Sequence, residues 1–368
     1  MMLSQALIMG TLSISDSIVS DKEFLLQRLG GNSGNMLFTE SLLRTLPGSA
    51  WHPSDSDRYG DADSIVIAAA NWLSPIMDYG WLADLIEKSD IPVFLVGVGA
   101  QSELDYSIPE VSRGTLRLLN IVSERSKLIS TRGRFSSEVL EYYGIKNSSP
   151  TGCPSLLLCG DEGPRFSSKE IGPQAVLHGT RHGIQGTDDF QNFLYRQAYK
   201  LGTGILLQSE LADLHIAFGD DPFDIDLDVA HMVGITYGTP NYEALINYLR
   251  GNAAFFHNFE EWLKYAKSKD FFVGSRIHGT IMSLIAGTPA VLIAHDARTV
   301  ELAKTMNIPH VIDTQVNIDR DLDFSHLYET FADNDFDVSY KKYREAFFEF
   351  FRTNGLATNR DVQLTGKI

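Results

Sequence analysis

The chain has 368 residues, of which 43% are hydrophobic and 21% are charged, and its formal net charge is −16. This length and composition are typical of a globular protein with two domains, each able to bury its own core. The negative charge argues against a general nucleic-acid binder, which normally presents a basic face. No apolar run approaches the about 20 residues that cross a bilayer, and the N-terminus lacks the basic start of a signal peptide, so we expect a cytoplasmic protein.

The first part of the chain alternates apolar runs with amphipathic segments. We expect buried strands at 6–10, 64–68, 92–99 and 127–130, and helices at 36–46, 81–88, 111–121 and 136–143. The run at 92–99 is continuously apolar and ends in glycines, which is typical of a parallel strand covered on both faces. Strands that alternate with helices at this spacing predict a parallel, doubly wound sheet.

A stretch rich in Gly, Pro, Ser and charge at 160–173 reads as a linker, after which the pattern restarts. Strands are expected at 174–177, 204–208, 253–256, 271–274 and 290–294, and helices at 189–201, 242–250, 259–267, 280–286 and 340–352. We therefore predict an α/β protein with two doubly wound, Rossmann-like domains that face a cleft. The domains span 1–165 and 172–337, and the helical segment 338–368 joins the first. Ligands bind such sheets at the carboxyl ends of the strands.

The segment from 271 to 294 carries the most informative pattern of the chain. A short apolar strand leads into a turn with Arg276 and His278 two residues apart, and a helix follows and stops at Gly287. The start of a helix favours anions, and the planar guanidinium of Arg276 matches a phosphate or a carboxylate. His278 can transfer a proton near neutral pH. The pattern predicts a site that holds an anionic substrate and protonates it; a surface salt bridge beside a structural histidine is the alternative.

The first half adds two candidate ligand contacts. Arg132 follows a strand, at the start of a helix that Ser136 can cap, and would place a guanidinium on the ligand edge of the first domain. The loop at 30–35 precedes a helix, and its glycines would let a phosphate or a sugar approach Asn32 and Asn35. That loop lacks the Lys-Ser/Thr pair of a P-loop and the glycine spacing of a dinucleotide-binding fingerprint. A solvated basic turn and a plain turn are the respective alternatives.

Polar residues follow several other predicted strands, where they could contact a sugar acceptor or a phosphate. These candidates are Gln101, His178, Arg181 and Gln208. His178 and His182 are four residues apart, but the glycines beside them argue against the helix that would let both bind one metal ion, and we expect no metal site. A structural loop is the alternative for each of these positions.

Three carboxylates are candidate general bases, although most carboxylates of so acidic a chain are simply solvated. They are Asp220, Asp221 and Asp296. The two cysteines, Cys153 and Cys159, fit no zinc or redox spacing, so we expect them to be small buried hydrophobic residues. The aromatic side chains of the last helix are expected in the core rather than in a membrane anchor. They are Phe347, Phe348, Phe350 and Phe351.

Several short motifs follow one another in a fixed order along the chain. They are a Gly-Asn-rich loop at 31–35, the strand end at 97–101, the pattern Ser/Thr-x-Arg-x3-Ser-x3-Leu-x3-Gly at 130–144, Thr-Gly-Cys-Pro-Ser-Leu at 151–156, and Gly-Ser-Arg-Ile-His-Gly at 274–279 with Gly-Thr-Pro at 287–289. With this ordered set the chain resembles the polysaccharide pyruvyl transferase family over most of its length. It departs from the family pattern at Gly133, where an acidic residue is frequent, and at 68–72, where a glycine run is frequent.

The resemblance implies a two-domain architecture like that of GT-B glycosyltransferases. It also implies transfer of the pyruvyl group of phosphoenolpyruvate to a sugar, usually as a ketal across two hydroxyls, in cell-surface polysaccharide (exopolysaccharide) or glycan biosynthesis. By similarity, Arg132 and Arg276, with Ile277 and Gly279, would hold the donor, and His278 would be the acid. The resemblance implies phosphoenolpyruvate as co-substrate and neither a nucleotide cofactor nor a metal. A lipid-linked oligosaccharide acceptor would bring the protein to a membrane surface.

The charge of phosphoenolpyruvate fits this interpretation, because about three negative charges call for converging arginines rather than a single lysine. Two alternatives remain open. A glycosyltransferase that uses a nucleotide sugar could have the same architecture, but it needs a pocket for base and ribose that the sequence does not reveal. A non-catalytic sugar-binding relative is the other, and the presence of Arg132, Arg276 and His278 argues against it.

Overall fold

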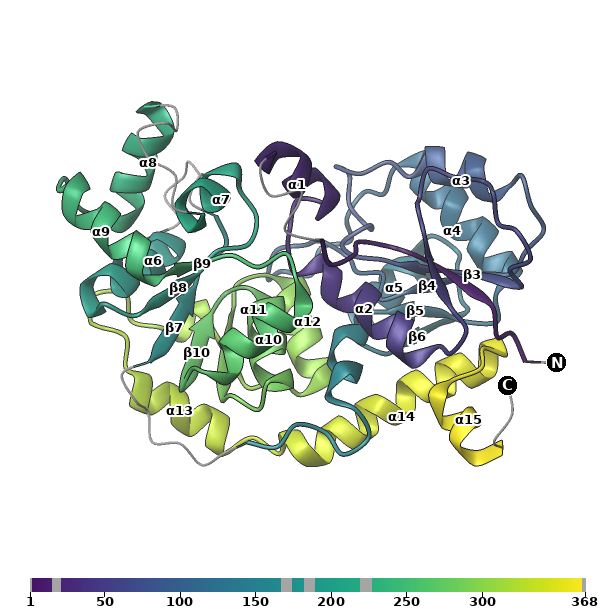
Figure 1. The fold of residues 1–368 in the computed structure, drawn as a ribbon. Coiled ribbons are helices and arrows are strands. Elements are labelled where there is room, and N and C mark those ends of the chain that lie inside the picture. The colour runs from purple at the N-terminus through teal and green to yellow at the C-terminus, as the bar shows by residue number, and fades with distance from the viewer. Residues whose placement is uncertain (1, 15–20, 167–173, 182–188, 219–226, 366–368) are drawn as a thin grey trace.

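The computed structural model describes the chain at 2–14, 21–166, 174–181, 189–218 and 227–365. Two main parallel sheets lie side by side, the first built by the N-terminal half of the chain and the second by the C-terminal half, and helices pack on both (Figure 1). This arrangement confirms the predicted class, an α/β protein with two Rossmann-like halves.

The first sheet contains β1 (Ala6–Met9), β2 (Ala50–His52), β3 (Ser64–Ala68) and β4 (Val93–Val96). These strands are parallel and lie in the order β2-β1-β3-β4. A further parallel pair, β5 (Ile129–Thr131) and β6 (Ser148–Pro150), continues the sheet beyond β4 through a bridge between Val98 and Thr131. Every residue of β3 and β4 is buried, as expected for strands covered on both faces.

Polar caps mark the starts of several helices in this half. The helices are α1 (Lys22–Arg28), α2 (Asn35–Thr45), α3 (Gly80–Ile86), α4 (Arg113–Arg125), α5 (Arg134–Tyr142) and the 3-10 helix η2 (Pro154–Cys159). Asp21 accepts the backbone N–H of Phe24 at the start of α1, and Ser112 accepts that of Thr115 at the start of α4. Such caps satisfy backbone donors that have no partner within the helix.

The second sheet has six parallel strands. They are β7 (Ala175–His178), β8 (Gly204–Leu206), β9 (Ala253–Ala254), β10 (Phe271–Gly274), β11 (Ala290–Ala294) and β12 (His310–Ile312). They lie in the order β12-β11-β10-β7-β8-β9. This is the doubly wound Rossmann order, and its direction reverses between β7 and β10. Ligands of such sheets bind beyond the carboxyl ends of the strands at that reversal.

The helices of this half cover both faces of the second sheet. They are α6 (Asp189–Leu201), α7 (Leu211–Ala217), α8 (Leu227–Tyr237), α9 (Tyr242–Asn252), α10 (Phe259–Lys267), α11 (Ile277–Ile285), α12 (Ala297–Met306), α13 (Phe324–Ala332) and the 3-10 turn η4 (Asp313–Gln315). The helix expected at 280–286 begins three residues earlier, at Ile277. Arg276 is therefore its N-cap, and His278 lies in its first turn instead of in a free loop.

The last two helices, α14 (Phe336–Asn354) and α15 (Asn359–Thr365), run beneath the molecule and end beside the first half (Figure 1). The side-chain oxygen of Asn354 accepts the backbone N–H groups of Lys127 and Leu128 at 3.0 and 3.1 Å, and a bridge joins Leu356 to Leu3. Of the four phenylalanines predicted to lie in the core, Phe347, Phe350 and Phe351 of α14 are fully buried, whereas Phe348 is only partly buried. The prediction that these aromatic side chains lie in the core is therefore confirmed for three of the four.

One apolar cluster holds the two halves together. Ile8 and Met36 of the first half and Phe272 and Ile281 of the second belong to it, together with Phe347 of α14. Burial of this shared core fixes the position of one sheet relative to the other. Among the helices that the structure describes, none is long and apolar enough to cross a membrane.

Candidate functional site

A pocket lies between the two halves, beyond the carboxyl ends of strands from both sheets. Its first wall consists of Asn32, Asn35, Ala70, Asn71 and Arg132, and its second wall of Thr180, Gln208, Ser275, Arg276, Ile277, His278, Arg298 and Thr299. Thr180 and Ser275 follow β7 and β10, the two strands that flank the reversal of the second sheet. We call this site the cleft pocket. Its position is the usual ligand site of a doubly wound sheet.

Arg132 reaches the cleft pocket from the loop between β5 and α5 and is only 3% exposed. Its Nε donates to the carbonyl oxygen of Gly97 at 3.1 Å, and its Nη1 donates to Oδ1 of Asn71. Gly99 leaves the room that this needs, because a Cβ there would lie 2.5 Å from Cδ of Arg132. Burial lowers the pKa of Arg132 to about 10, so the guanidinium is still charged at neutral pH. Both hydrogen-bond partners are neutral oxygens.

Arg276 enters from the opposite wall, as the N-cap of α11. Its Nη2 donates to the carbonyl oxygen of Thr180 and to Oγ of Ser209, and its Nε donates to the carbonyl oxygen of Gly179 at 3.4 Å. Burial lowers the pKa of Arg276 to about 10. Its side-chain partners, too, are neutral oxygens, so the two halves each supply a cation whose charge the hydrogen bonds do not neutralise.

His278 is 7% exposed and lines the cleft pocket together with these two cations. Its Nε2 is 3.6 Å from Sγ of Cys153. The glycine loop of the first half packs on the ring, and a Cβ at Gly34 would lie 2.6 Å from Cβ of His278. Burial, with the charges of Arg132, Arg276 and Arg298, lowers the pKa of His278 to about 3. The imidazole is therefore neutral at pH 7 when the pocket holds no anion.

Arg298 is a third cation of the cleft pocket, and the sequence analysis did not identify it. It lies in the first turn of α12, where Nη2 is 2.9 Å from Oδ2 of Asp296. Asp296 also caps α12 by accepting the backbone N–H of Thr299 at 2.7 Å. Burial alone would raise the pKa of Asp296, but Arg298 and the bonds from Thr299 hold it below its usual value. This carboxylate is engaged in structure and does not line the pocket, which disfavours its predicted role as a general base.

A buried carboxylate links the elements that carry Arg298 and Arg132. Glu301 of α12 accepts the backbone N–H and the hydroxyl of Ser136, both at 2.7 Å, and so caps α5 from the other half of the chain. Ser136 itself lies inside α5, contrary to its predicted role as the cap. Gly133 is needed for this contact, because a Cβ there would lie 2.2 Å from Cγ of Glu301. The residue that departs from the family pattern thus makes room for a carboxylate from α12.

The glycine loop contributes two asparagines to the cleft pocket, as expected from the sequence. Asn35 donates its Nδ2 to the carbonyl oxygens of Leu29 and Gly30 at 3.2 and 3.1 Å, and so holds the loop in shape. Asn32 accepts the backbone N–H of Gly34 at 2.8 Å. Gln208 and Ile277 also line the pocket.

The structure does not place the other candidates in the lining of the cleft pocket. His178 is fully buried behind Arg276, whose backbone N–H it accepts at Nδ1 at 3.1 Å, and Gly279 packs against its ring. Gln101 and Arg181 are exposed on the surface and are not among the residues that line the pocket. The remaining candidates, His182, Asp220 and Asp221, lie outside the described residues.

Cys153 differs from the inert hydrophobic residue that its spacing suggested. It is buried, but its Sγ contacts His278 and also lies 3.2 Å from Oγ of Ser155. Cys159 is only partly buried. Within the described ranges, no cluster of three or more His, Cys, Asp or Glu side chains could hold a metal ion.

Of three comparisons with known proteins, the comparison with protein families agrees with the sequence motifs. Two solved structures align with the chain at 11% identity: one titled as the glycotransferase of kitacinnamycin (96% of this chain, 84% of that chain, TM-score 0.32) and one as the wall teichoic acid polymerase TagF, H444N variant (95% and 89%, TM-score 0.38). TM-scores this low carry no weight for fold or function. No curated protein matches the sequence. Residues 13–297, which include the whole lining of the cleft pocket except Arg298 and Thr299, match the family described as polysaccharide pyruvyl transferase, and the chain belongs to that family.

Proposed function

We propose that this protein transfers the pyruvyl group of phosphoenolpyruvate to a pair of sugar hydroxyls and forms a ketal during the synthesis of a polysaccharide or glycan. One observation carries the proposal. Arg132 and Arg276, one from each half, are buried cations with neutral hydrogen-bond partners, and they line one pocket with the neutral imidazole of His278. The phosphate and carboxylate of phosphoenolpyruvate would supply the missing negative charge.

Arg132 and Arg276 would bind the phosphate and the carboxylate of the donor, and Arg298 would add a third positive charge on the same wall as Arg276. Ile277 lines the pocket and would contact the donor directly. Gly279 would act from behind, because it keeps the His178 ring packed beneath Arg276. The family resemblance and the pocket lining support these roles together.

His278 would be the acid, and its environment explains how the donor switches it on. Burial and three nearby guanidiniums keep the imidazole of His278 unprotonated until an anion binds. A bound trianion would offset those charges, raise the pKa of His278, and allow it to take up a proton. Donor binding would therefore prepare the proton that the reaction needs.

The proposed reaction balances without an oxidant, a metal or a nucleotide cofactor. His278 protonates the methylene carbon of the enol, the first sugar hydroxyl adds to the neighbouring carbon, phosphate leaves with cleavage of its bond to that carbon, and the second hydroxyl closes the ketal. One hydroxyl proton returns to His278 and the other leaves with the phosphate. No Asp or Glu occurs among the described residues that line the pocket, which supports the phosphate and His278 as proton carriers.

The acceptor would be a free or a lipid-linked sugar, and in the second case the protein would meet it at a membrane surface. A cytoplasmic reaction belongs to the proposal, since its donor is a cytoplasmic metabolite. Neither nucleic acid nor a resident cofactor has a part in it.

The test is a screen of acceptors with phosphoenolpyruvate as donor. Free and lipid-linked galactose, glucose, mannose and N-acetylated sugars are incubated with the protein, and phosphate release and product mass are measured. We expect phosphate release that depends on the acceptor, and a product that has gained a pyruvyl unit. Thermal stabilisation by a nucleotide sugar, with none by phosphoenolpyruvate, would instead identify a nucleotide-sugar-dependent glycosyltransferase.

A further inference from the structure

Among the described residues of the cleft pocket, the side chains of Gln208 and Thr180 have buried polar atoms without a hydrogen bond. Gln208 follows β8, lines the pocket and is 2% exposed, and neither its Nε2 nor its Oε1 has a partner in the part of the chain that the structure describes. Oγ1 of Thr180, on the same wall, is also buried and unpaired. Most buried side-chain polar atoms in folded proteins have a hydrogen-bond partner, and an unpaired buried amide destabilises the fold. The unpaired atoms of Gln208 and Thr180 therefore indicate a ligand that forms hydrogen bonds with them.

The backbone around Gln208 is held in place by bonds that leave the amide group free. The carboxylate of Asp213 accepts the backbone N–H groups of Gln208 and Ser209 at 3.0 and 2.9 Å. The carbonyl oxygen of Gln208 accepts the backbone N–H of Ser33 at 2.9 Å. Ser33 precedes Gly34, which packs on His278. The backbone of Gln208 is thus bonded to the same glycine loop that packs on the imidazole of His278.

The chemistry of the amide decides what it can bind. At neutral pH phosphoenolpyruvate has only oxygen acceptors, so it could satisfy Nε2 of Gln208 but would face Oε1 with like partial charge. A hydroxyl both donates and accepts, and two neighbouring hydroxyls could satisfy both atoms of one amide. The ligand that completes this wall must therefore carry O–H groups and no negative charge at the point of contact.

We propose that Gln208, with Thr180, forms a subsite for a neutral polyhydroxyl ligand beside Arg276, whose guanidinium donates to the carbonyl oxygen of Thr180 and to Oγ of Ser209. The identification of this ligand as the acceptor sugar rests on the proposed function. The subsite would then hold sugar hydroxyls beside His278 and the donor, and so help to select the acceptor.

The experiment measures sugar binding and donor binding separately in matched variants. Gln208→Met removes both polar atoms at nearly constant volume. Gln197→Met is the control: Gln197 is also buried, at 6% exposed, but it lies away from the pocket and its Oε1 accepts the backbone N–H of Leu322 at 3.0 Å. Saturation-transfer NMR with methyl glycosides of galactose, glucose, mannose and N-acetylglucosamine reports sugar affinity, and calorimetric titration with phosphoenolpyruvate reports donor affinity.

We expect the wild type to bind at least one glycoside and Gln208→Met to bind it about tenfold more weakly, with phosphoenolpyruvate affinity unchanged. Its melting temperature should not fall, because two unpaired atoms are removed, whereas Gln197→Met should melt earlier because it leaves the N–H of Leu322 unpaired. A wild type that binds no glycoside, an unchanged glycoside affinity in Gln208→Met, or an equal loss of donor affinity would overturn the subsite. Glycoside binding that depends on Gln208 in a protein that does not bind phosphoenolpyruvate would preserve the subsite and refute the proposed function.

Discussion

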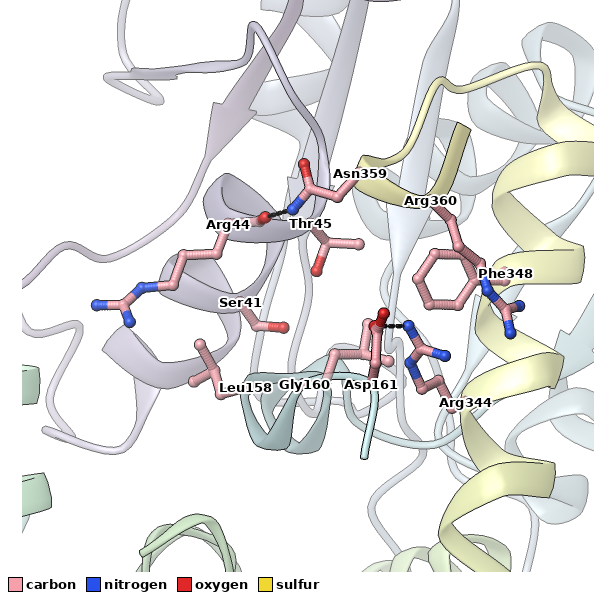
Figure 2. Close-up of a pocket in the computed structure, with 11 residues that line it drawn as sticks. Ser41, Arg44, Thr45, Leu158, Gly160, Asp161, Arg344, Phe348, Asn359 and Arg360 are labelled. Atoms are coloured by element: carbon pink, nitrogen blue, oxygen red, sulfur yellow. Dashed lines mark hydrogen bonds and ion pairs between the residues drawn. The ribbon is translucent and has the colours of Figure 1, made fainter. Parts of the chain in front are cut away.

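Two pockets of this molecule each contain three arginines, but they hold them in different ways. The cleft pocket contains Arg132, Arg276 and Arg298. A second pocket, between α2, η2 and the C-terminal helices, contains Arg44, Arg344 and Arg360 (Figure 2). In this α14–α15 pocket Arg344 points to Asp161, while Asn359 reaches the backbone of Arg44 (Figure 2).

Each arginine of the α14–α15 pocket forms an ion pair with a carboxylate. Arg44 lies 2.7 Å from Glu40 and 2.8 Å from Glu260, Arg360 lies 2.6 Å from Glu345, and Arg344 pairs with Asp161. An anionic ligand would have to displace those carboxylates. In the cleft pocket, counting the described residues alone, only Arg298 has such a partner, while the partners of Arg132 and Arg276 are neutral. The comparison teaches that the partners of a guanidinium, rather than the number of guanidiniums, distinguish an anion site from a structural cluster.

The largest effect on turnover should come from substitution of His278. The lining of the cleft pocket contains this imidazole beside its arginines, whereas no histidine occurs among the described residues that line the α14–α15 pocket. We expect His278→Ala to lower turnover by about 100-fold or more, because general acid catalysis is lost, while donor affinity changes by about threefold at most. Steady-state kinetics and calorimetric titration with phosphoenolpyruvate measure the two quantities. Turnover close to that of the wild type would remove His278 from the chemistry.

An arginine-to-lysine substitution in each pocket tests the difference between them. Arg276→Lys should weaken phosphoenolpyruvate binding by about 10- to 100-fold, because an ammonium cannot make the bidentate contact of a guanidinium. Arg344→Lys, in the α14–α15 pocket, should leave donor affinity unchanged. Equal losses of phosphoenolpyruvate affinity in the two variants would mean that ion pairs with carboxylates do not distinguish a structural arginine cluster from an anion site.

The neutral state of His278 also predicts how stability depends on pH. Its pKa is about 3 in the folded protein and about 6.5 when unfolded, so between these values the unfolded chain binds a proton that the native protein does not. Stability therefore rises with pH across this window, and acidification from pH 7 to pH 5 should cost about 2 kcal/mol through this group.

Urea unfolding at the two pH values measures this effect. The loss of stability on acidification should be about 2 kcal/mol smaller in His278→Gln than in the wild type. His326 is the control, since its side chain is 72% exposed, and His326→Gln should leave the pH dependence nearly as it is. An identical loss in wild type and His278→Gln would show that the cleft cations do not keep this imidazole neutral.

The smallest effect concerns the thiol beside the imidazole. Cys153→Ala removes the contact of Sγ with Nε2 of His278, and with it a group that orients the ring. We expect turnover to fall by about 3- to 10-fold with donor affinity unchanged, and Cys153→Ser to recover part of the loss because a hydroxyl can also bond the ring. If the alanine variant matches the wild type, the thiol has no part in orienting His278.

Strand patterns and the strongest motif could be predicted from the sequence because they are local. The runs at 64–68 and 290–294 are strands with the predicted bounds, and Arg132, Arg276 and His278 meet in one pocket. A strand buried on both faces shows itself by continuous apolar residues, and a ligand site follows where such strands end.

The helix that carries Arg298 was missed for a physical reason. Its apolar residues Ala297, Val300, Ala303 and Met306 do recur three apart on the buried side, but Thr299 and Glu301 are buried among them. Those polar residues are buried because each has a distant or capping partner, as Glu301 has in Ser136. No local pattern encodes such a partner. The capping sequence that starts at Asp296 was a further signal, but Asp296 was interpreted as a general base.

A crystal structure of the protein with phosphoenolpyruvate bound would show directly which pocket holds the donor. We expect the structure to show what the partners of the arginines imply: the donor in the cleft pocket, with its phosphate and carboxylate on Arg132 and Arg276, and none in the α14–α15 pocket. A donor bound among Arg44, Arg344 and Arg360, or an empty cleft pocket at a saturating donor concentration, would contradict this expectation.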